Sequence, residues 1–465
     1  MTVLDRLQSA LPANAFRDPS AKYLEEPRDR MAGTALAVVA PGSTDEVAAV
    51  IRIAAETGTP VIPHGGGTGL VLGQLTDNGA PLILSTERLT AIRDVSAPED
   101  VIVAEAGVTI EAIQNAATEA DRLFPLSYAS QGTATIGGAL AVNSGGINVL
   151  RYGNTRDLCL GLEAVLPDGS IWNGLKRLRK DNTGYDLRHL LIGAEGTLGV
   201  ITAASLRLSP RPANEAALLM TVPDPDTALA LLPRARAHLG EAVSAFELIR
   251  GTGIDFLEET GTPYRRPFED TPDWMVLIGI GGPASQDINA GLEAFFEEAL
   301  DAGHTDDGIL SQSEADRAAL WAMRETIPEA NRRIGAIASH DISLPLSAIP
   351  DFIKEGEAAM QSFGPLRINV FGHLGDGNLH YNLFPPVGQT REDFDDRKED
   401  MTRTLHDMVH ARGGSFSAEH GVGRLKVGDL ERYGDPTKLA AMRAIKTALD
   451  PKGIMNPGAV LRGSN

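Results

Sequence analysis

The sequence predicts an α+β protein of at least two domains. The chain has 465 residues, which is more than one hydrophobic core usually supports. In its N-terminal half, short strands and turns outnumber helices, and strand and helix do not alternate regularly as they do in a doubly wound sheet. The segment Ser209-Pro210-Arg211-Pro212 marks a boundary, after which a new unit begins near residue 213.

The first half begins with a β-α-β pattern. An apolar strand over residues 35–40 precedes Ser43-Thr44-Asp45-Glu46, the pattern of a capping box, which opens a helix over residues 47–56. A second strand, residues 59–63, leads into the glycine-rich run 65–69. The further elements of this half are predicted as strands over residues 82–85, 101–105 and 161–166 and a helix over residues 110–120.

The second half alternates strands and helices. This order suits an open antiparallel sheet with helices on one side. A charged helix is expected over residues 391–412. The other predicted elements are strands over residues 218–222, 273–280 and 341–345 and helices over residues 226–237 and 288–302.

Composition excludes several classes of protein. The chain has 42 Lys and Arg against 62 Asp and Glu, and the net charge of −20 repels nucleic acid and anionic lipid. No apolar run approaches the roughly 20 residues that a membrane span needs. The single cysteine, Cys159, excludes an internal disulfide and suits a reducing compartment. Residues 1–16 show no targeting pattern, so we expect a cytoplasmic protein.

Two glycine clusters indicate a bound anion and a flat ligand. The run Gly65-Gly66-Gly67-Thr68-Gly69 leaves backbone N–H groups unobstructed, as in a phosphate-binding turn, although a plain turn is the alternative. It is neither a P-loop nor a dinucleotide fingerprint, because no Lys-Ser/Thr follows and Leu72 replaces the third glycine. Residues 132–146 contain five glycines and several small hydroxyl side chains. Two more glycine-bearing stretches follow, at 180–187 and 193–199.

The segments PHGGGTGL, GTATIGGALAVNSGG, RKDNTGYDL and IGAEGTLGVIT, in this order, resemble the FAD domain of the vanillyl-alcohol oxidase type. The resemblance implies a two-part FAD-binding domain whose first loop binds the pyrophosphate. Covalent relatives have a histidine where this chain has Gly67, so non-covalent FAD is expected; His64 is interpreted as a polar strand-end residue. The implied cofactor-binding residues are Gly66, Gly67, Thr68, Gly69, Thr133, Gly137, Gly138, Asn143, Gly145 and Gly199.

Three of the ten histidines fall in two short motifs, GHLGDGNLH and SAEHGVG. Asp376-Gly377 is a turn signal between two extended runs, so His373 and His380 can face one another across a hairpin. Glu419 would complete a His-His-Glu set with an open position, which suits Zn²⁺ or a similar divalent ion. By spacing alone, a hydrogen-bonded pair of core histidines remains the alternative.

The longer segments FGHLGDGNLHYN and FSAEHGVG resemble signatures of FAD-linked D-lactate and D-2-hydroxyglutarate dehydrogenases. The resemblance implies oxidation of a D-2-hydroxy acid to the 2-keto acid, with metal assistance and hydride transfer to flavin N5. The roles that it implies are metal ligation by His373, His380 and Glu419, general base catalysis by His420, a substrate contact by Asn382, and carboxylate binding by Arg324.

Two departures bear on the substrate. Pro328 and Ser339 stand where 2-hydroxyglutarate enzymes tend to have threonine and lysine. The missing donors favour a monocarboxylate such as D-lactate, although Arg332 or Arg333 could substitute.

We therefore expect an FAD-binding domain over residues 1–212, a substrate domain with the metal site over residues 213–425, and a C-terminal segment, 426–465, that packs back on the FAD domain. The expected partners are a small 2-hydroxy acid and an electron acceptor that the sequence does not identify; a homodimer is left open. One alternative is another alcohol-oxidising flavoenzyme of this fold with a metal-free histidine acid/base site. Another is a metallohydrolase with a degenerate nucleotide domain.

Overall fold

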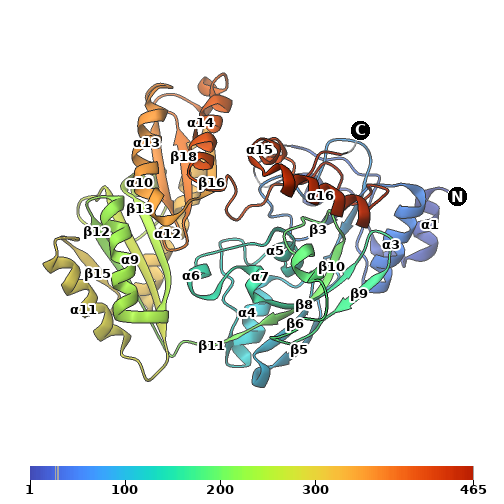
Figure 1. Cartoon of the computed structure of the whole chain (residues 1–465), viewed down its shortest axis with the longest axis horizontal. Coiled ribbons are helices and arrows are strands. Elements are labelled where there is room, and N and C mark those ends of the chain that lie inside the picture. The colour runs from blue at the N-terminus through green and yellow to red at the C-terminus, as the bar shows by residue number, and fades with distance from the viewer. Residues whose placement is uncertain (27, 29–30, 464–465) are drawn as a thin grey trace. The chain divides into compact units, whose positions relative to one another are not determined.

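The computed structural model of this chain describes residues 1–26, 28 and 31–463. These residues form two compact units (Figure 1). The first unit contains Met1–Gly146, Gly153–Arg211 and Glu419–Asn465, and the second contains Ile147–Tyr152 and Pro212–Ala418. The chain therefore leaves the first unit, builds the second, and returns to the first for its last segment.

The first unit contains two main β-sheets, which together with irregularly placed helices confirm the predicted α+β class. The smaller sheet has the order β1 (Phe16–Arg17), β2 (Ala37–Val39), β4 (Leu82–Ser85), β3 (Val61–His64), with β2, β4 and β3 parallel. The larger is antiparallel, with the order β5 (Ile92–Ser96), β6 (Val101–Glu105), β10 (Val200–Arg207), β8 (Cys159–Val165), β9 (Ile171–Gly174). A short ladder joins β7 (Arg122–Leu123) to β11 (Ser209–Pro210).

Helix α3 (Thr44–Thr57) shows how the local sequence sets an element. Oγ of Ser43 accepts a hydrogen bond from the N–H of Glu46 at 3.2 Å, so the helix begins earlier than the predicted residue 47. The Glu46 carboxylate accepts from the N–H of Gly42 at 2.6 Å, so only half of the predicted capping box forms. The other helices of the unit are α1 (Val3–Ala10), α2 (Ala21–Leu24), α4 (Ile110–Glu119), α5 (Ile136–Val142), α7 (Thr155–Leu158), α8 (Leu187–Leu191), α15 (Val427–Tyr433) and α16 (Pro436–Leu449).

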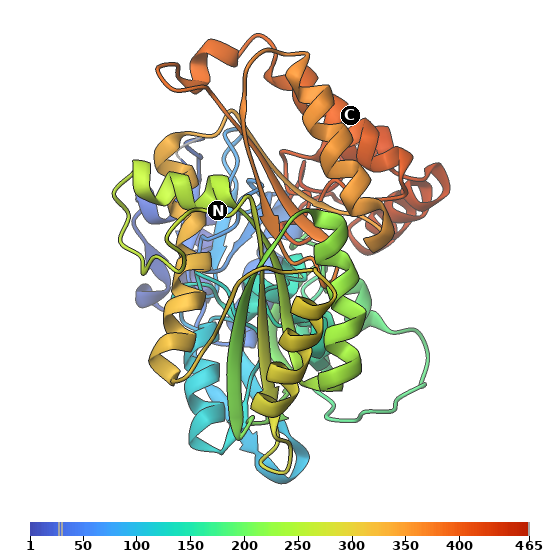
Figure 2. The same ribbon diagram turned by 90° about the vertical axis from the view of Figure 1, so that its left-hand side faces the viewer.

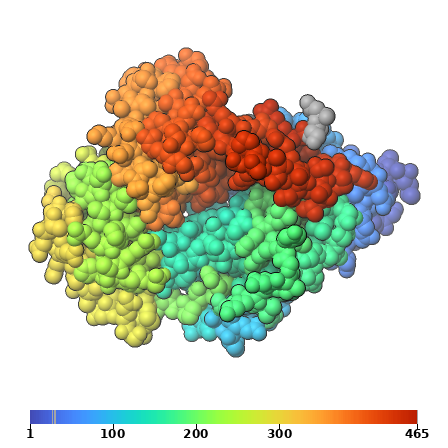
Figure 3. Space-filling model, in the orientation of Figure 1, coloured from blue at the N-terminus to red at the C-terminus, as the bar shows by residue number. Residues whose placement is uncertain are grey.

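The C-terminal segment of the chain pairs with strand β3. The N–H of Val61 donates to the carbonyl of Ile454, and the N–H of Asn456 donates to the carbonyl of Val61, each at 2.8 Å. In the space-filling view, the C-terminal residues (red) lie directly against residues of the N-terminal part (blue to teal) of the same unit (Figure 3). The last segment therefore completes the unit that the first residues begin.

The second unit is built on one antiparallel sheet of seven strands. Because β15 and β16 end the order, the sheet is open, as predicted. All neighbouring strands are antiparallel. The order is β15 (Gly308–Leu310), β12 (Asn214–Val222), β14 (Trp274–Gly282), β13 (Val243–Arg250), β17 (Arg367–Gly372), β18 (Asn378–Phe384), β16 (Ala338–Ser343).

Helices cover both faces of this sheet, so the prediction of helices on one side only is wrong. One apolar core joins the sheet to α9 (Pro225–Leu239), α11 (Ile288–Asp301), α13 (Ile349–Gln361) and α14 (Lys398–Ala411). A second core joins the opposite face to α10 (Gly251–Glu259) and α12 (Glu314–Ile334). Figure 2 shows α12 on one side of the strands and the pair α9 and α11 on the other. The reason is that consecutive residues such as Leu218 and Leu219 are both apolar, and each face must be buried.

The short helix α6 (Val149–Tyr152) also belongs to the second unit, because Arg151 donates to the carbonyl of Gly281 in β14. Among all the helices of the described residues, none is both long and apolar enough to cross a membrane.

Candidate flavin and metal site

The hairpin of β17 and β18 brings two histidines together. Its turn begins at His373, whose carbonyl accepts hydrogen bonds from the N–H groups of Gly377 and Asn378. Gly377 has a φ of 89°, a left-handed conformation that favours glycine. The ring centroids of His373 and His380 lie 5.6 Å apart. The turn predicted at Asp376-Gly377 therefore forms and sets the two imidazoles side by side.

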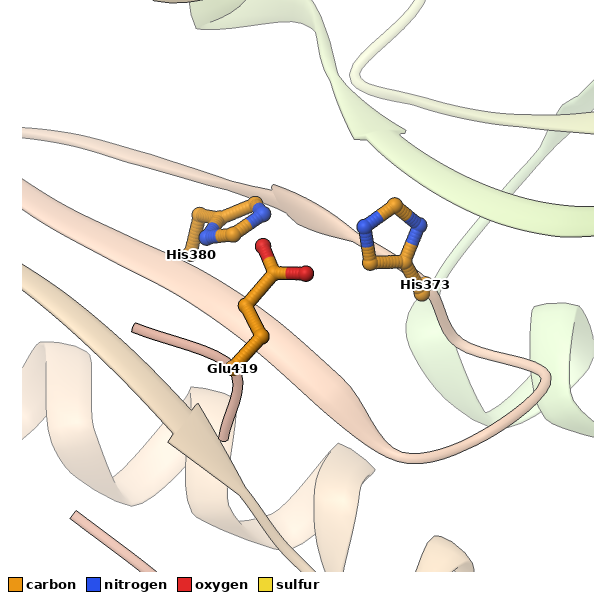
Figure 4. A group of neighbouring side chains, drawn as sticks. All are labelled: His373, His380 and Glu419. Atoms are coloured by element: carbon orange, nitrogen blue, oxygen red, sulfur yellow. The ribbon is translucent and has the colours of Figure 1, made fainter. Parts of the chain in front are cut away.

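Glu419 completes a group of three possible metal ligands. It follows Ala418, the last residue of the second unit, whose N–H donates to the carbonyl of Asp341 in β16 at 3.2 Å. One ligand atom each from His373, His380 and Glu419 lies within 4.8 Å of the others. Figure 4 shows the carboxylate of Glu419 beside the two rings. Two imidazole nitrogens and a carboxylate oxygen suit Zn²⁺ and leave a coordination position for substrate.

His420 lies next to this group. Its Nε2 is 3.9 Å from Oε1 of Glu419, and both side chains are partly exposed. A second, overlapping set of possible ligands consists of Asp341, Glu419 and His420. Asp341 is buried, and its Oδ1 accepts a hydrogen bond from Nδ2 of Asn378 at 3.0 Å. The structure therefore brings the predicted base and the predicted metal ligand Glu419 together.

A buried carboxylate that the sequence analysis missed joins two of the predicted residues. Glu247 of β13 is fully buried, and its Oε1 lies 2.6 Å from Nδ1 of His373. Its Oε2 accepts a hydrogen bond from Nε of Arg324 at 2.8 Å and forms an ion pair with Nη2 at 2.7 Å. Burial alone would raise the pKa of Glu247, but His373 and Arg324 outweigh burial and lower the pKa to about 2. The only sequence signal was one carboxylate inside the apolar strand AFELI.

Arg324 lies on the side of α12 that faces the sheet. It is only 5% exposed and shares the buried stripe of the helix with Leu320 and Ile327. Its guanidinium carbon lies 4.7 Å from the centroid of the Phe371 ring. Nε and Nη2 are bonded to Glu247, whereas Nη1 has no hydrogen-bond partner among the residues that the structure describes. One nitrogen of this buried cation is therefore available to an anion.

Further polar side chains lie on this otherwise apolar sheet face. On β18, Tyr381 packs in the core beneath α9, α11, α13 and α14. Its neighbours His380 and Asn382 therefore lie on the other face of the sheet, which α12 with Arg324 covers. Nδ2 of Asn382 donates to the carbonyl of His380 at 3.1 Å. On the neighbouring strand β17, Asn369 is fully buried and donates to Oδ1 of Asn331 in α12 at 3.0 Å. The predicted substrate residue Asn382 thus lies on the same face as a predicted metal ligand.

In the first unit, the first glycine loop packs against the second glycine cluster. A Cβ added to Gly66 would lie 2.1 Å from the carbonyl oxygen of Thr133, and one added to Gly65 would lie 2.7 Å from Oγ1 of Thr135. Real Cβ atoms do not approach so closely, so only glycine fits at both positions. A backbone that is packed this tightly, with no side chains in the way, fits a pyrophosphate that binds through N–H groups.

The other residues predicted to bind FAD lie in the same unit, in loops or at helix ends. Asn143 ends α5 with a φ of 58°, and its Oδ1 accepts from the N–H of Arg156 at 2.9 Å. Gly199 directly precedes β10. The remaining positions are Gly67, Thr68 and Gly69 in the loop after β3, Thr133 before α5, Gly137 and Gly138 in its first turn, and Gly145 in the loop after it.

His64 ends β3 and is buried against the first glycine loop. A Cβ added to Gly67 would lie 3.4 Å from its ring, and Tyr23 makes an edge contact with a 5.5 Å centroid separation. Nδ1 of His64 is buried and has no hydrogen-bond partner within the described part of the chain. Burial lowers the pKa of His64 to about 4, so the ring is neutral at pH 7. His64 is at the strand end, as predicted, but faces the loop.

A tightly packed glycine loop lies in one unit, and a histidine and carboxylate group is linked to a buried arginine; both features fit a flavin-dependent oxidoreductase. Two family models match the chain. Residues 35–174 match the FAD binding domain, and residues 211–460 match the C-terminal domain of FAD linked oxidases. The chain belongs to the family of FAD-linked oxidases.

The chain is similar to proteins of known function along nearly all of its length. It is 37% identical to D-2-hydroxyglutarate dehydrogenase of Xanthomonas citri pv. viticola, over 97% of this chain and 95% of the relative. It is also 37% identical to the mitochondrial D-2-hydroxyglutarate dehydrogenase of Bos taurus, over 98% of this chain and 83% of the relative. Its fold is similar to that of p-cresol methylhydroxylase, solved with substrate bound, with a TM-score of 0.78, 15% identity, and coverage of 99% of this chain and 96% of the other.

Proposed function

We propose that this chain is an FAD-dependent dehydrogenase that oxidises a D-2-hydroxy acid to the 2-keto acid. The observation that carries the proposal is the meeting of His373, His380 and Glu419 within 4.8 Å. The names of the two relatives support this chemistry. In the proposal, residues 1–212 bind FAD, residues 213–425 bind metal and substrate, and residues 426–465 pack back on the FAD-binding part.

FAD is proposed to bind non-covalently. When bound, it supplies the acceptor for the electrons that leave the substrate carbon. The tight contact of Gly66 with Thr133 supports a pyrophosphate site on the first loop. The residues proposed to hold FAD are Gly66, Gly67, Thr68, Gly69, Thr133, Gly137, Gly138, Asn143, Gly145 and Gly199.

His373, His380 and Glu419 are proposed to hold a divalent metal ion, and Zn²⁺ is the ion that this ligand set fits best. When bound, this ion would lower the pKa of the substrate hydroxyl. His420 then removes the hydroxyl proton as general base. Nη1 of Arg324 binds the substrate carboxylate, and a guanidinium suits that partner. Asn382 contacts the substrate from the same sheet face.

Two positions bear on the size of the substrate. Ser339 is exposed and pairs with Asn382 across the β16–β18 ladder, whereas Pro328 lies inside α12. Neither side chain offers a positive charge to a second carboxylate, which favours D-lactate. The relatives' names favour D-2-hydroxyglutarate. A comparison of the rates with D-lactate and D-2-hydroxyglutarate therefore decides the size of the substrate.

The cellular setting is also a proposal. Cys159 is the single cysteine and is buried, which suits a reducing compartment such as the cytoplasm. We propose that electrons pass on to a separate acceptor.

Anaerobic bleaching of the flavin tests the activity. The purified yellow protein is mixed with D- and L-lactate, D- and L-2-hydroxyglutarate, malate and glycolate, with and without a chelator. We expect one D-2-hydroxy acid to bleach the flavin and the chelator to slow that bleaching. A colourless protein, or a flavin that no hydroxy acid reduces, would contradict the proposal. Fast bleaching by a metal-free protein would favour the metal-free acid/base site instead.

Variants of the ligands test the metal site. His373→Ala and Glu419→Ala should each lose bound metal and activity while retaining FAD. His238→Ala is a matched control in the second unit, because this exposed histidine pairs with Glu298 at 2.7 Å. The control should retain metal, FAD and activity. Wild-type metal content in both ligand variants would contradict the site.

A further inference from the structure

Glu247 is a fully buried carboxylate inside an apolar strand. Its neighbours Phe246 and Leu248 pack in the core of one sheet face, so the side chain of Glu247 projects from the other face. Its partner across the β13–β14 ladder is the apolar Leu277. A charge in such surroundings is costly unless it is paired and hydrogen-bonded.

Two residues of the candidate site share this carboxylate. Oε1 of Glu247 lies 2.6 Å from Nδ1 of His373. Oε2 accepts a hydrogen bond from Nε of Arg324 at 2.8 Å and forms an ion pair with Nη2 at 2.7 Å. None of the three side chains is more than 9% exposed. They come from β13, from the hairpin turn and from α12, all within the second unit.

The contact with Glu247 sets the tautomer of His373. Nδ1 must carry a proton in order to donate to an ionised carboxylate, so the lone pair of the neutral ring is on Nε2. Figure 4 shows one ring nitrogen of His373 facing Glu419 and His380, and the other turned away from them. A histidine that donates its second N–H to a carboxylate is held in place and becomes a stronger metal ligand.

The same carboxylate fixes Arg324. Nε donates to Oε2 of Glu247, Nη2 forms an ion pair with the same oxygen, and the ring centroid of Phe371 lies 4.7 Å from the guanidinium carbon. Glu247 therefore holds one edge of the guanidinium, and the Phe371 ring packs against its plane. Nη1, which has no partner among the described residues, remains for a further acceptor.

We propose that Glu247 is a positioning residue that sets metal affinity and substrate binding together. It holds His373 for the metal and Arg324 for the substrate carboxylate. The inference rests on the proposed function, because it takes a metal at His373 and a carboxylate at Arg324. A purely structural ion pair would affect stability alone, whereas the loss of a shared positioning group weakens metal and substrate binding at once.

Glu247→Gln tests this role with little change of side-chain shape. The amide has one acceptor oxygen and one donor nitrogen, so it cannot accept from His373 and Arg324 together. We expect the dissociation constant for Zn²⁺, measured on the resting holoenzyme by chelator competition, to rise about 10- to 100-fold. KM for the hydroxy acid should rise as well, with unchanged FAD content. Wild-type values of both quantities would overturn the inference.

Glu163→Gln is the matched control. Glu163 is also a buried strand carboxylate paired with an arginine, since its Oε1 lies 3.0 Å from Nη2 of Arg93 and its side chain is 8% exposed. It belongs to β8 of the first unit. This variant should melt at a lower temperature but bind Zn²⁺ as the wild type does. An equal loss of Zn²⁺ affinity in both variants would indicate general destabilisation and overturn the inference.

Two further measurements separate the possible failures. A wild-type protein that binds no Zn²⁺ would overturn the proposed metal site itself, before any variant is compared. If Glu247→Gln yields no soluble protein, nitrogen-15 NMR of histidine-labelled wild type decides, with the signal of His373 assigned by its loss in His373→Gln. A proton on Nδ1 of His373 supports the role of Glu247, and a proton on Nε2 overturns it.

Discussion

Oε1 of Glu195 accepts a hydrogen bond of 2.7 Å from the backbone N–H of Val422, although 227 positions separate the two residues. Oε2 accepts from the N–H of Gly423 at 2.8 Å. Both contacts lie within the first unit. They fasten the chain immediately after Glu419 and His420, the two residues proposed to bind the metal and to act as base.

Removal of this carboxylate should loosen the segment that it holds. Glu195→Ala leaves two backbone N–H groups without acceptors, and each such loss costs about 1–3 kcal/mol. We expect a lower free energy of unfolding and faster hydrogen exchange at residues 419–423. Glu119→Gln, on the exposed side of α4, is the control and should change neither. Equal unfolding and exchange in the two variants would contradict the role of Glu195.

Gly66 should be irreplaceable for FAD binding. In Gly66→Ala the new Cβ would meet the carbonyl oxygen of Thr133 at 2.1 Å, so the loop or the glycine cluster must move. We expect the variant to lose most of its flavin, measured as flavin absorbance per protein. Gly132→Ala is the control, because its Cβ would make an ordinary contact of 3.5 Å with Glu111. Full flavin content in Gly66→Ala would count against the proposed pyrophosphate site.

His64 should make the stability of the protein sensitive to acid. Its pKa is about 4 in the folded protein against the ordinary 6.5, so the unfolded chain binds the proton more readily. The stability from the neutral ring is fully present above about pH 6.5 and declines as the pH falls to about 4. The decline amounts to about 3 kcal/mol. His64→Gln cannot take up a proton, so its urea unfolding should vary less between pH 7 and 4. An unchanged slope would refute this assignment.

His420 should act on the rate of flavin reduction and not on metal content. His420→Gln removes the proposed base, which typically slows such a step by ~10²-fold or more. Stopped-flow reduction of the flavin by the best D-2-hydroxy acid measures the rate, and metal analysis checks that the ion stays. His238→Ala again serves as control. A wild-type rate in His420→Gln would exclude it as the base.

Local signals in the sequence predicted the local parts of the structure. Asp376-Gly377 predicted the turn that sets His373 beside His380, because turn geometry depends on a few neighbouring residues. Ser43 marked the start of α3 for the same reason, although the helix begins earlier than expected. Family resemblance supplied the FAD-binding fold, which spacing alone did not define.

Long-range pairing was beyond sequence reasoning. Glu247 is 77 positions from Arg324 and 126 from His373, and nothing in its neighbourhood indicates either partner. The continuous apolar run from Trp274 to Ile278 in β14 is typical of a strand buried on both faces, in agreement with the helices on both sides of the sheet. Metal identity and substrate size depend on a few side chains whose roles the proposed experiments decide.

The pairing of β3 with the chain near Met455 has a practical consequence for dissecting this protein. The first unit, which contains the proposed FAD site, is discontinuous in sequence. A fragment that stops at Arg211 would therefore leave Val61 without the backbone partners that Ile454 and Asn456 provide. A shortened protein that retains the whole first unit would need the segment from Glu419 onward joined to Arg211 through an artificial linker. Conversely, residues 212–418 form one uninterrupted insertion, to which the second unit adds only the segment with α6, so a swap of this insertion between relatives would have to carry residues 147–152 with it.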